Sequence, residues 1–389
     1  MGHKAHGLEG LQTEPDWPSL TLAEVDRLLR KYPQAGGALR LLSHSPRPFS
    51  SASLVQTPHG KVMVKRHARS VRDREGLLEE HRLLEFLSDR TRLVQAACRR
   101  EDGESAIERA DWTYEVHPAA TGLDLYEERY SWTPFLSEDH ARSAGRALAQ
   151  LHKAAESYEV PSRKTQQLVT SFTIFAYSTG GNSPVAQMER YLSYRPLLRE
   201  YAEQRDWRRS FEQLLMPLYR NLQPWLKYLR PVWTHNDFHA SNLMWSGEGV
   251  DAEVTGIIDF GLADRTNAVH DLATAIERNV VEWLQMDDPR AEIVHLDHLD
   301  ELLAGYEELF PLSYEQARAL VAMLPLVHCE FALSETDYFL SVLHSEERAC
   351  LAYEGYFLAH AEWFRGVQRQ RLLEHLRKWA DRHATEATQ

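Results

Sequence analysis

The chain is predicted to adopt an α+β fold with two lobes, a small β-rich lobe followed by a larger, mostly helical lobe. Short alternating apolar segments bounded by turn residues concentrate before residue 118, whereas apolar residues at helical spacing dominate after it. A chain of 389 residues is also long enough to bury more than one core. We therefore divide it into an N-terminal extension at 1–34, an N-lobe at 35–117 and a C-lobe at 118–389.

The elements of the first part are predicted from turn and capping signals. Thr21-Leu22-Ala23-Glu24 has the pattern of a capping box, which predicts a short helix through Arg30. The remaining elements expected here are strands at 53–56 and 61–65 around the turn Thr57-Pro58-His59-Gly60, a helix at 76–87 and a strand at 113–116.

The second part is predicted to be helical except at 231–261, where short strands and loops are expected. Apolar residues at helical spacing predict helices at 140–152 and 370–380, and the aromatic and charged stretch 185–230 is also expected to be helical. Helices are expected to dominate again from residue 271 onward.

Composition limits the class of protein. The three cysteines, Cys98, Cys329 and Cys350, form no CxxC pair, which argues against a disulfide framework or a cysteine zinc site. The first ten residues contain no apolar signal region, and no segment was expected to reach the roughly 20 apolar residues of a membrane span. We therefore expect a cytoplasmic protein without a membrane partner.

Charge is unevenly distributed along the chain. The part from Pro231 to Gln389 contains 28 acidic and 11 basic residues, a net charge of −17, whereas Met1 to Arg230 contains 29 acidic and 33 basic residues, a net charge of +4. A basic first part suits a polyphosphate ligand, and an acidic second part suits a cationic partner, although solvated helix faces have the same composition. The overall charge of −13 disfavours nucleic acid as a partner.

The segment from His235 to Gly261 carries the most informative motif. Asp237 and Asn242 stand five residues apart, and Asp259 follows the predicted buried strand 254–258. An Asp within reach of an alcohol hydroxyl can accept its proton, and Asn and Asp oxygens are hard ligands of the kind that Mg²⁺ prefers. The pattern therefore predicts metal-assisted phosphoryl transfer from ATP, with Asp237 catalytic and Asn242 and Asp259 as metal ligands.

A rival hypothesis rests on the same segment. His235, Asp237 and His239 alternate, so on a strand all three would face one way and could bind zinc or iron as in a metal-dependent hydrolase. This hypothesis leaves Asn242 and the Asp259-Phe260-Gly261 sequence without a role. In the phosphotransfer interpretation His235 supports the loop through hydrogen bonds instead.

A phosphate-binding cation is expected in the N-lobe. Lys65 ends the alternating strand 61–65 and can point into a cleft, and the helix that follows offers Glu79 and Glu80 as partners. Glu80 shares a helix face with apolar residues and so points toward the protein body. We therefore predict a Lys65–Glu80 pair.

These residues together resemble the aminoglycoside phosphotransferase and choline kinase group of small-molecule kinases, over roughly residues 40–380. The resemblance implies a protein-kinase-like two-lobed fold, ATP and Mg²⁺ as cofactors, and the roles given above for Asp237, Asn242, Asp259, Lys65 and Glu80. It further implies that Asp271 supports the catalytic loop, and that the segment Tyr114 to His117 forms the hinge to adenine. In that segment we assigned Glu115, Val116 and His117 to nucleotide binding.

The chain departs from the kinase pattern in two places. The expected nucleotide loop at 43–53 contains no glycine, so we assigned phosphate contacts to Ser50 and Ser51 through hydroxyl and backbone groups. No Ala-Pro-Glu signal or activation loop follows Gly261, which argues against the alternative of a protein Ser/Thr kinase.

The acceptor is expected to be a small molecule with a hydroxyl group, and a cationic one would suit the acidic second part of the chain. The stretch 330–364 is rich in carboxylates and aromatic residues, which could bind an amine, although the same residues could equally form a helix core and its wet face. An amino sugar, an amino alcohol or a hydroxylated amino acid would fit. The sequence leaves the oligomeric state open.

Overall fold

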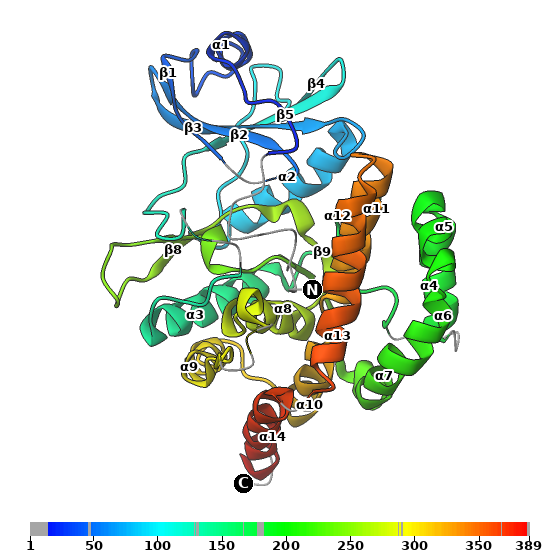
Figure 1. Cartoon of the computed structure of the whole chain (residues 1–389). Coiled ribbons are helices and arrows are strands. Elements are labelled where there is room, and N and C mark those ends of the chain that lie inside the picture. The colour runs from blue at the N-terminus through cyan, green and yellow to red at the C-terminus, as the bar shows by residue number, and fades with distance from the viewer. Residues whose placement is uncertain are drawn as a thin grey trace.

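The computed structural model describes residues 15–386 except 46–47, 128, 130–131, 166, 177–182, 287, 289–290 and 367. A β-sheet with two helices forms one end of the molecule, and a larger assembly of helices forms the other (Figure 1). The predicted α+β class with a small β-rich lobe and a larger helical lobe is confirmed.

The sheet has five antiparallel strands in the order β1-β2-β3-β5-β4. The strands are β1 (Arg40–His44), β2 (Ser51–Thr57), β3 (Gly60–Ala68), β4 (Ala106–Arg109) and β5 (Trp112–Pro118). Gly60 supplies the positive φ of 140° that the tight β2–β3 turn requires. Each strand predicted in this part is confirmed, with longer bounds.

The two faces of the sheet differ in chemistry because side chains alternate along each strand. Val64 and Val116 belong to an apolar core on one face, whereas Lys65 and Glu115 lie opposite each other in register and point to the other face. The second face is therefore polar, and it faces the cleft between the lobes.

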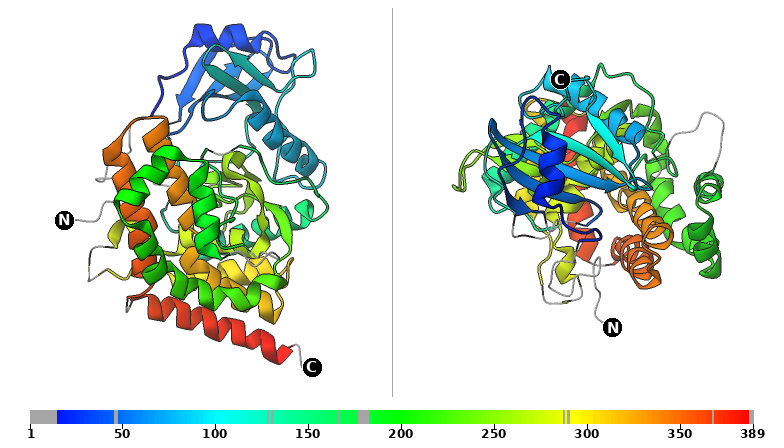
Figure 2. Two further views of the ribbon diagram at one scale, coloured as in Figure 1. Left: turned by 90° about the vertical axis from the view of Figure 1, so that its right-hand side faces the viewer. Right: turned by 90° about the horizontal axis from the view of Figure 1, so that it is seen from above.

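Helix α1 (Leu22–Leu29) covers the apolar face of the sheet (Figure 2, right). The predicted capping box between Thr21 and Glu24 is present. The described part of the extension also contacts the helical lobe, since the Asp16 carboxylate accepts a hydrogen bond from the Tyr338 hydroxyl at 2.8 Å and pairs with Arg348 at 2.6 Å. Residues 15–34 are thus packed into the fold.

Helix α2 (Arg74–Ser88) lies beside the polar face of the sheet. The Asp73 side chain caps its N-terminus by accepting a hydrogen bond from Gly76 N at 2.7 Å. Leu83, Leu84 and Leu87 are buried together with Glu80, as the helical spacing predicted.

The helical lobe is organised around α3 (Glu138–Ala155) and α9 (Leu296–Glu307), which cross in direct backbone contact. A Cβ atom on Gly145 would lie 2.1 Å from Leu302 O, and one on Gly305 would lie 2.0 Å from Arg142 O. Only glycine permits this approach, so the two helices pack through Gly145 and Gly305.

The other helices are α4 (Pro184–Ser193), α5 (Pro196–Gln204), α6 (Trp207–Ser210), α7 (Met216–Leu222), α8 (Ala268–Val280), α10 (Tyr314–Met323), α11 (Cys329–Ser341), α12 (Glu346–Cys350), α13 (Ala359–Trp363) and α14 (Gln368–Glu386). The pair of α3 and α9 lies at one side of the helical lobe, with α4 to α7 on the opposite side (Figure 1), and α14 lies at the end farthest from the sheet (Figure 2, left). The helices predicted at 140–152 and 370–380, and the largely helical character of 185–230, are confirmed.

One helical stretch, 314–341, corrects the expectation that no segment would be long and apolar enough to span a membrane. It contains 28 residues with a mean hydropathy of 1.4 over its most apolar window. Of that window, 89 % is buried inside the protein, which is also what a core helix of a soluble domain shows.

Candidate active site

Two short antiparallel strand pairs carry the candidate site below the sheet. Strand β6 (Pro231–Thr234) pairs with β9 (Asp264–Asn267), and β7 (Leu243–Trp245) pairs with β8 (Val254–Ile257). The β6–β7 connection contains Asp237 and Asn242, and the β8–β9 connection contains Asp259. The pairing brings the two connections together, and a hydrogen bond from Ile258 N to Asn242 O at 2.9 Å joins them.

Asp271, in the first turn of α8, holds the first connection in place. Its carboxylate accepts hydrogen bonds from His235 N at 2.8 Å, Asn236 N at 2.7 Å and His152 Nε2 at 3.0 Å. Burial raises the pKa of Asp271, but the bond from His152 and the other donors outweigh it and hold the pKa below its ordinary value. The geometry agrees with the supporting role predicted for Asp271.

His235 links the two connections through its ring. Its Nδ1 accepts a hydrogen bond from the Asp237 backbone N–H at 3.2 Å, so Nε2 carries the ring hydrogen and donates to Ile258 O at 3.0 Å. Both ring nitrogens are therefore engaged within the protein. Asn236, between these residues, adopts a φ of +62°, which Asn tolerates better than most residues.

The carboxylate of Asp237 lies at the point where several charged groups meet. Its Oδ2 is 3.4 Å from His239 Nε2, and its Oδ1 is 3.7 Å from the Arg278 guanidinium. Burial raises the pKa of Asp237, but the charges of His239 and Arg278 outweigh this and hold the pKa well below its ordinary value. Asp237 is thus ionised at neutral pH, the state in which a carboxylate can accept a hydroxyl proton.

Asn242 and Asp259 fit a magnesium ion chemically. The Asn242 amide NH₂ donates to Asp237 O at 2.9 Å, so its Oδ1 remains as an oxygen ligand. Asp259 adopts a left-handed backbone conformation with φ +63°, and its side chain is 47 % exposed. Both residues line the same cavity and offer the hard oxygen atoms that Mg²⁺ prefers.

The predicted Lys65–Glu80 pair needs correction. Lys65 Nζ lies 3.0 Å from Asp259 Oδ1, and this ion pair connects the sheet to the helical lobe. Glu80 lies 3.7 Å from Arg163 Nη2 and contributes to the field around Lys65 without being its ion-pair partner. The helical spacing correctly predicted that Glu80 points toward the protein interior. The Lys65 side chain, however, extends across the cleft to Asp259.

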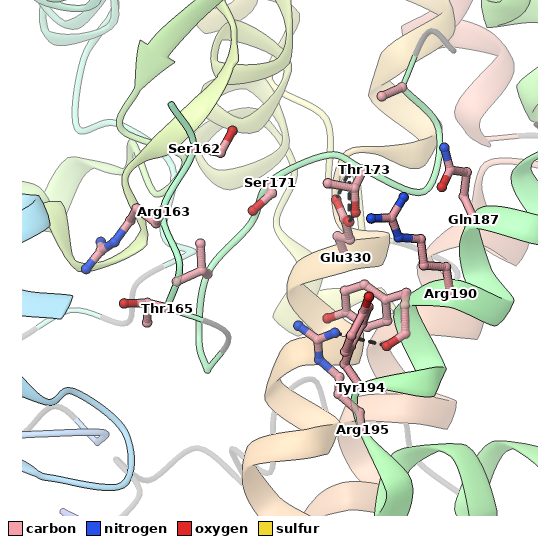
Figure 3. A pocket seen from close by; sticks show the side chains of 13 residues that line it. Ser162, Arg163, Thr165, Ser171, Thr173, Gln187, Arg190, Tyr194, Arg195 and Glu330 are labelled. Carbon is pink, nitrogen blue, oxygen red and sulfur yellow. Dashed lines mark hydrogen bonds between the residues drawn. The ribbon is translucent and has the colours of Figure 1, made fainter. Parts of the chain in front are cut away.

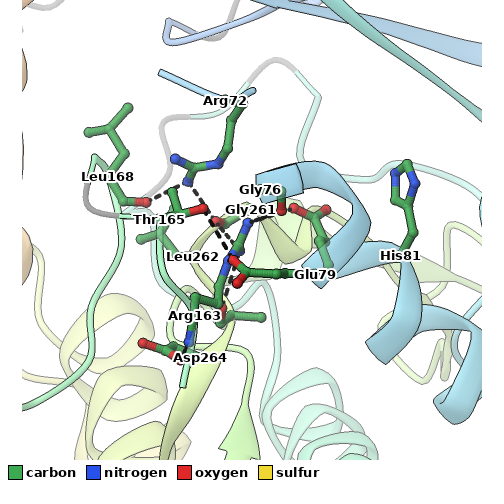
Figure 4. Close-up of polar contacts among 12 residues, drawn as sticks. Arg72, Gly76, Glu79, His81, Arg163, Thr165, Leu168, Gly261, Leu262 and Asp264 are labelled. Carbon is green, nitrogen blue, oxygen red and sulfur yellow. Dashed lines mark hydrogen bonds and ion pairs between the residues drawn. The ribbon is translucent and has the colours of Figure 1, made fainter. Parts of the chain in front are cut away.

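Two arginines fasten the Asp259 loop to helix α2 and the segment before residue 170 (Figure 4). Arg163 donates to Gly261 O at 3.0 Å and to Gly76 O at 2.9 Å, and Arg72 donates to Gly261 O at 2.7 Å and to Leu168 O at 2.8 Å. Sequence reasoning missed both arginines, because their partners are backbone carbonyls far away in the chain.

A cavity of about 440 Å³ lies between the two lobes. Lys65, Glu80, His117, Asn242 and Asp259 all line it. Ser43, His44 and Ser45, which belong to the predicted nucleotide loop 43–53, also line the cavity. Residues 118–124, after β5, form a wall that the sequence analysis did not foresee.

The cavity agrees with the hinge and loop assignments only in part. His117 lines it, but Glu115 and Val116 are buried within strand β5, and the connection between the lobes begins only after Pro118. The Ser51 hydroxyl donates to Pro18 O at 2.7 Å and so faces the extension. Neither Ser50 nor Ser51 is among the described residues that line the cavity, a position that Ser43 to Ser45 occupy instead.

The geometry is also unfavourable to the rival hydrolase site. His235, Asp237 and His239 lie in a loop, and both nitrogens of His235 are already engaged with Asp237 N and Ile258 O. Within the described part of the chain, these three residues do not form a cluster of metal-ligand geometry.

Arg278 is a site residue that the sequence analysis did not identify. Its guanidinium lies over the rings of Trp132, Phe331 and Tyr356 at 5.2, 4.9 and 5.8 Å from their centroids. A usable signal existed, since Glu277 and Arg278 are adjacent charges within the otherwise largely apolar helix α8.

A second cavity, of about 370 Å³, lies between the segment 162–176 and helix α4 (Figure 3). Arg190 and Arg195 project into it from α4 and the residue that precedes α5. Glu330 on α11 faces them and accepts a hydrogen bond from Thr173 N at 2.7 Å. Glu330, the first residue of the stretch 330–364 predicted near the acceptor, is instead engaged by Thr173 in this second cavity.

A sheet lobe and a helical lobe, with Lys65, Asp237, Asn242 and Asp259 gathered at their junction, define a kinase-type phosphotransferase. A family model described as the phosphotransferase enzyme family, APH, matches residues 46–312. This is more than half of the sequence, so the chain belongs to that family and is a phosphotransferase. Comparison with curated protein sequences finds no match.

Solved structures support the same fold. A microcompartment-associated aminopropanol kinase is 17 % identical over 91 % of this chain and 98 % of its own, with a TM-score of 0.57. Amicoumacin kinase in complex with AMP-PNP and Ca²⁺ is 12 % identical over 86 % and 91 %, with a TM-score of 0.53. An aminoglycoside phosphotransferase from Alicyclobacillus acidocaldarius is 15 % identical over 94 % and 98 %, with a TM-score of 0.50. The likeness is one of fold, and it confirms the expected protein-kinase-like architecture.

Proposed function

We propose that the protein transfers the γ-phosphoryl group of ATP to a hydroxyl group of a small molecule that carries a positive charge. The observation that carries this proposal is that Lys65, Asn242 and Asp259 line the cavity between the lobes, with Asp237 directly behind Asn242, whose amide nitrogen lies 3.3 Å from Asp237 Oδ2. Amicoumacin kinase, of similar fold, has been crystallised with an ATP analogue and a divalent cation, which supports the same pair of ligands here.

Each of these side chains has a role that its chemistry allows. Asp237 orients the acceptor hydroxyl and accepts its proton as the phosphoryl group is transferred, while Lys65 binds donor phosphate oxygens. Asn242 and Asp259 would hold Mg²⁺, which neutralises charge on the phosphates when bound. Asp271 and His235 are positioning residues, since they act by holding the loop that carries Asp237.

The charges around Asp237 favour a cationic acceptor. The carboxylates of Asp237, Glu277 and Glu335 surround a single guanidinium, that of Arg278. These three carboxylates outnumber the cations Arg278 and His239, and the rings of Phe331 and Tyr356 already lie against the Arg278 guanidinium, so the region favours positive charge. An amino alcohol or amino sugar satisfies both features, and the similar aminopropanol kinase is named for an amino alcohol.

A small acceptor also suits the short connection after the Asp259 loop. Strand β9 begins at Asp264 and α8 at Ala268, so few residues separate Gly261 from the next helix. The short connection offers little chain on which a protein substrate could lie, and it disfavours the Ser/Thr kinase alternative. We propose that the protein is located in the cytoplasm, because ATP is available there and a reducing environment suits the unpaired cysteines.

The test is a phosphate-transfer screen of amino alcohols, amino sugars and neutral alcohols with Mg-ATP, read by the mass gain of a phosphoryl group. We expect amine-bearing alcohols to be phosphorylated and neutral analogues to react poorly. Transfer to protein substrates alone, or no transfer to any small alcohol, would contradict the proposal.

A further inference from the structure

Three histidines surround one buried carboxylate in the N-lobe, away from the Asp237 loop. Glu115 Oε2 lies 2.8 Å from both His81 Nε2 and His117 Nε2, and Glu115 Oε1 lies 2.9 Å from His67 Nε2. The side chains of Glu115 and His81 are 1 % and 4 % exposed. Nothing in the phosphotransfer chemistry requires such a cluster.

The fold brings these residues together on the polar face of the sheet. Glu115 and His117 are two residues apart on β5 and so point the same way, and His67 lies on the adjacent strand β3. His81 comes from α2, which lies against this face, and its ring projects from the helix away from Arg163 (Figure 4). The cluster therefore joins the helix to the sheet.

We propose that His81, Glu115 and His117 bind a divalent transition-metal ion, of which Zn²⁺ is the best candidate. One ligand atom from each residue lies within 4.8 Å of the others, and the three atoms form the only such group among the described residues. Two imidazoles and a carboxylate are a ligand set that zinc accepts, with water in the fourth position of a tetrahedral site. Mg²⁺ prefers oxygen ligands, so this site differs in chemistry from that of Asn242 and Asp259.

Partners outside the three ligands fix their orientation. His81 Nδ1 lies 2.8 Å from Ser105 Oγ, which directs Nε2 toward Glu115, and His67 holds the second oxygen of the same carboxylate. Metal-binding histidines and carboxylates in proteins usually have such outer hydrogen bonds. The alternative is a purely hydrogen-bonded cluster, in which each imidazole donates a hydrogen bond to the Glu115 carboxylate and no metal ion binds.

The test uses the full chain without a histidine tag, stripped of metal by a chelator, and titrates Zn²⁺ by calorimetry. We expect one equivalent to bind, and we expect His81→Ala and His117→Ala each to weaken binding at least about tenfold. His59→Ala is the matched control, because His59 is exposed on the β2–β3 turn of the same sheet. Asp259→Ala should bind zinc normally, which separates this site from the magnesium site.

Co²⁺ replaces Zn²⁺ in a second measurement that needs no variant. Visible absorption of a tetrahedral Co²⁺ centre, removed by adding Zn²⁺, supports the site even if a histidine variant fails to fold. Absence of stoichiometric Zn²⁺ binding by the wild-type chain, or binding that both folded histidine variants retain in full, overturns the proposal in favour of the hydrogen-bonded cluster.

Discussion

Lys65 on the sheet and Asp259 in the helical lobe form an ion pair of 3.0 Å across the cleft, although they are 194 residues apart in sequence. The Lys65 side chain is 17 % exposed and that of Asp259 47 %. Burial lowers the pKa of Lys65, but the charges of Asp259 and Glu115 outweigh it and raise that pKa. In a kinase with its ligands bound, the lysine binds donor phosphate oxygens and the carboxylate binds Mg²⁺.

Replacing Asp259 should therefore affect ligands more than stability. In Asp259→Ala we expect Mg-dependent ATP affinity to fall by about tenfold or more, since a metal ligand is lost. We expect the unfolding temperature without ligand to change little, because a partly exposed ion pair contributes only about 0–1 kcal/mol.

Calorimetry of ATP binding with and without Mg²⁺ measures the first effect, and thermal unfolding the second. Asp251→Ala, an exposed carboxylate in the β7–β8 turn region, is the control. ATP affinity that keeps its full magnesium dependence in Asp259→Ala would show that Asp259 is not a metal ligand.

Asp237→Asn should separate binding from turnover. Asparagine keeps the shape of the side chain but cannot accept the hydroxyl proton, so we expect kcat to fall by about 10²–10⁴-fold while Mg-ATP still binds. Initial rates with an amine-bearing alcohol from the screen measure kcat, and Asp139→Asn, exposed on α3, serves as the control. Unchanged turnover would remove Asp237 from the catalytic role.

Asp271→Asn should destabilise the protein, because an amide cannot serve all three donors that the carboxylate accepts. We expect a loss of about 3–5 kcal/mol in the free energy of unfolding at pH 7. The folded pKa of Asp271 lies below the ordinary 3.8, so its stabilising effect is complete above about pH 4 and is lost as the pH falls further.

Urea unfolding of both proteins at several pH values measures this difference. The gap between wild type and Asp271→Asn should be widest near neutral pH and should narrow below about pH 4. Asp381→Asn, which removes only an exposed ion pair with Arg318, is the control and should show a small effect at every pH. A stability difference between wild type and Asp271→Asn that grows as the pH falls would contradict the stabilising role of the ionised Asp271 carboxylate.

Much of this architecture could be predicted from local sequence. The Thr21 capping box, the β2–β3 hairpin and the amphipathic helices depend on neighbouring residues, and all of them formed. The spacing of Asp237 and Asn242 was informative for the same reason, since one short loop fixes their separation.

What the sequence could not reveal depends on contacts between distant segments. The partner of Lys65 is set by the closure of the two lobes, and Arg278 reaches Asp237 only because α8 packs beneath the loop. The family resemblance placed Glu115 in a hinge, whereas the structure buries it among three histidines from three separate elements. Helical or alternating patterns do not encode such contacts.

Glu330 should make stability fall as the pH rises. Burial raises its pKa to about 7, from an ordinary value of 4.5, even though Thr173 donates to it and Arg195 lies near. Between these values the folded protein keeps a proton that the unfolded chain releases, so stability should decrease by up to about 3 kcal/mol from pH 4.5 to pH 7.

Glu330→Gln cannot ionise and still offers an acceptor to Thr173, so it should be more stable than wild type at pH 8 and nearly equal to it at pH 5. Unfolding in urea at the two pH values measures the effect. Glu374→Gln, exposed on α14, should behave like wild type. Equal stability of Glu330→Gln and wild type at pH 8 would mean that Glu330 ionises without cost in the folded protein.

Glu335→Gln should weaken binding of the acceptor and leave binding of ATP, the phosphoryl donor, nearly unchanged. Glu335 is 5 % exposed, and its carboxylate contributes to the negative field around Arg278, the arginine beside Asp237. Removing one negative charge from a largely desolvated site should raise the KM for a cationic acceptor about tenfold, or about 1.4 kcal/mol, while the KM for ATP stays within about twofold.

The informative comparison is between a cationic acceptor and a neutral alcohol of similar shape. Charge recognition predicts that Glu335→Gln affects the cationic acceptor far more than the neutral one, whereas a packing defect would affect both. Glu354→Gln removes an exposed carboxylate from the neighbouring helical segment, where it pairs with Arg205 at 3.3 Å, and should leave both KM values unchanged. An equal rise in KM for both acceptors would mean that Glu335 supports the site without recognising charge.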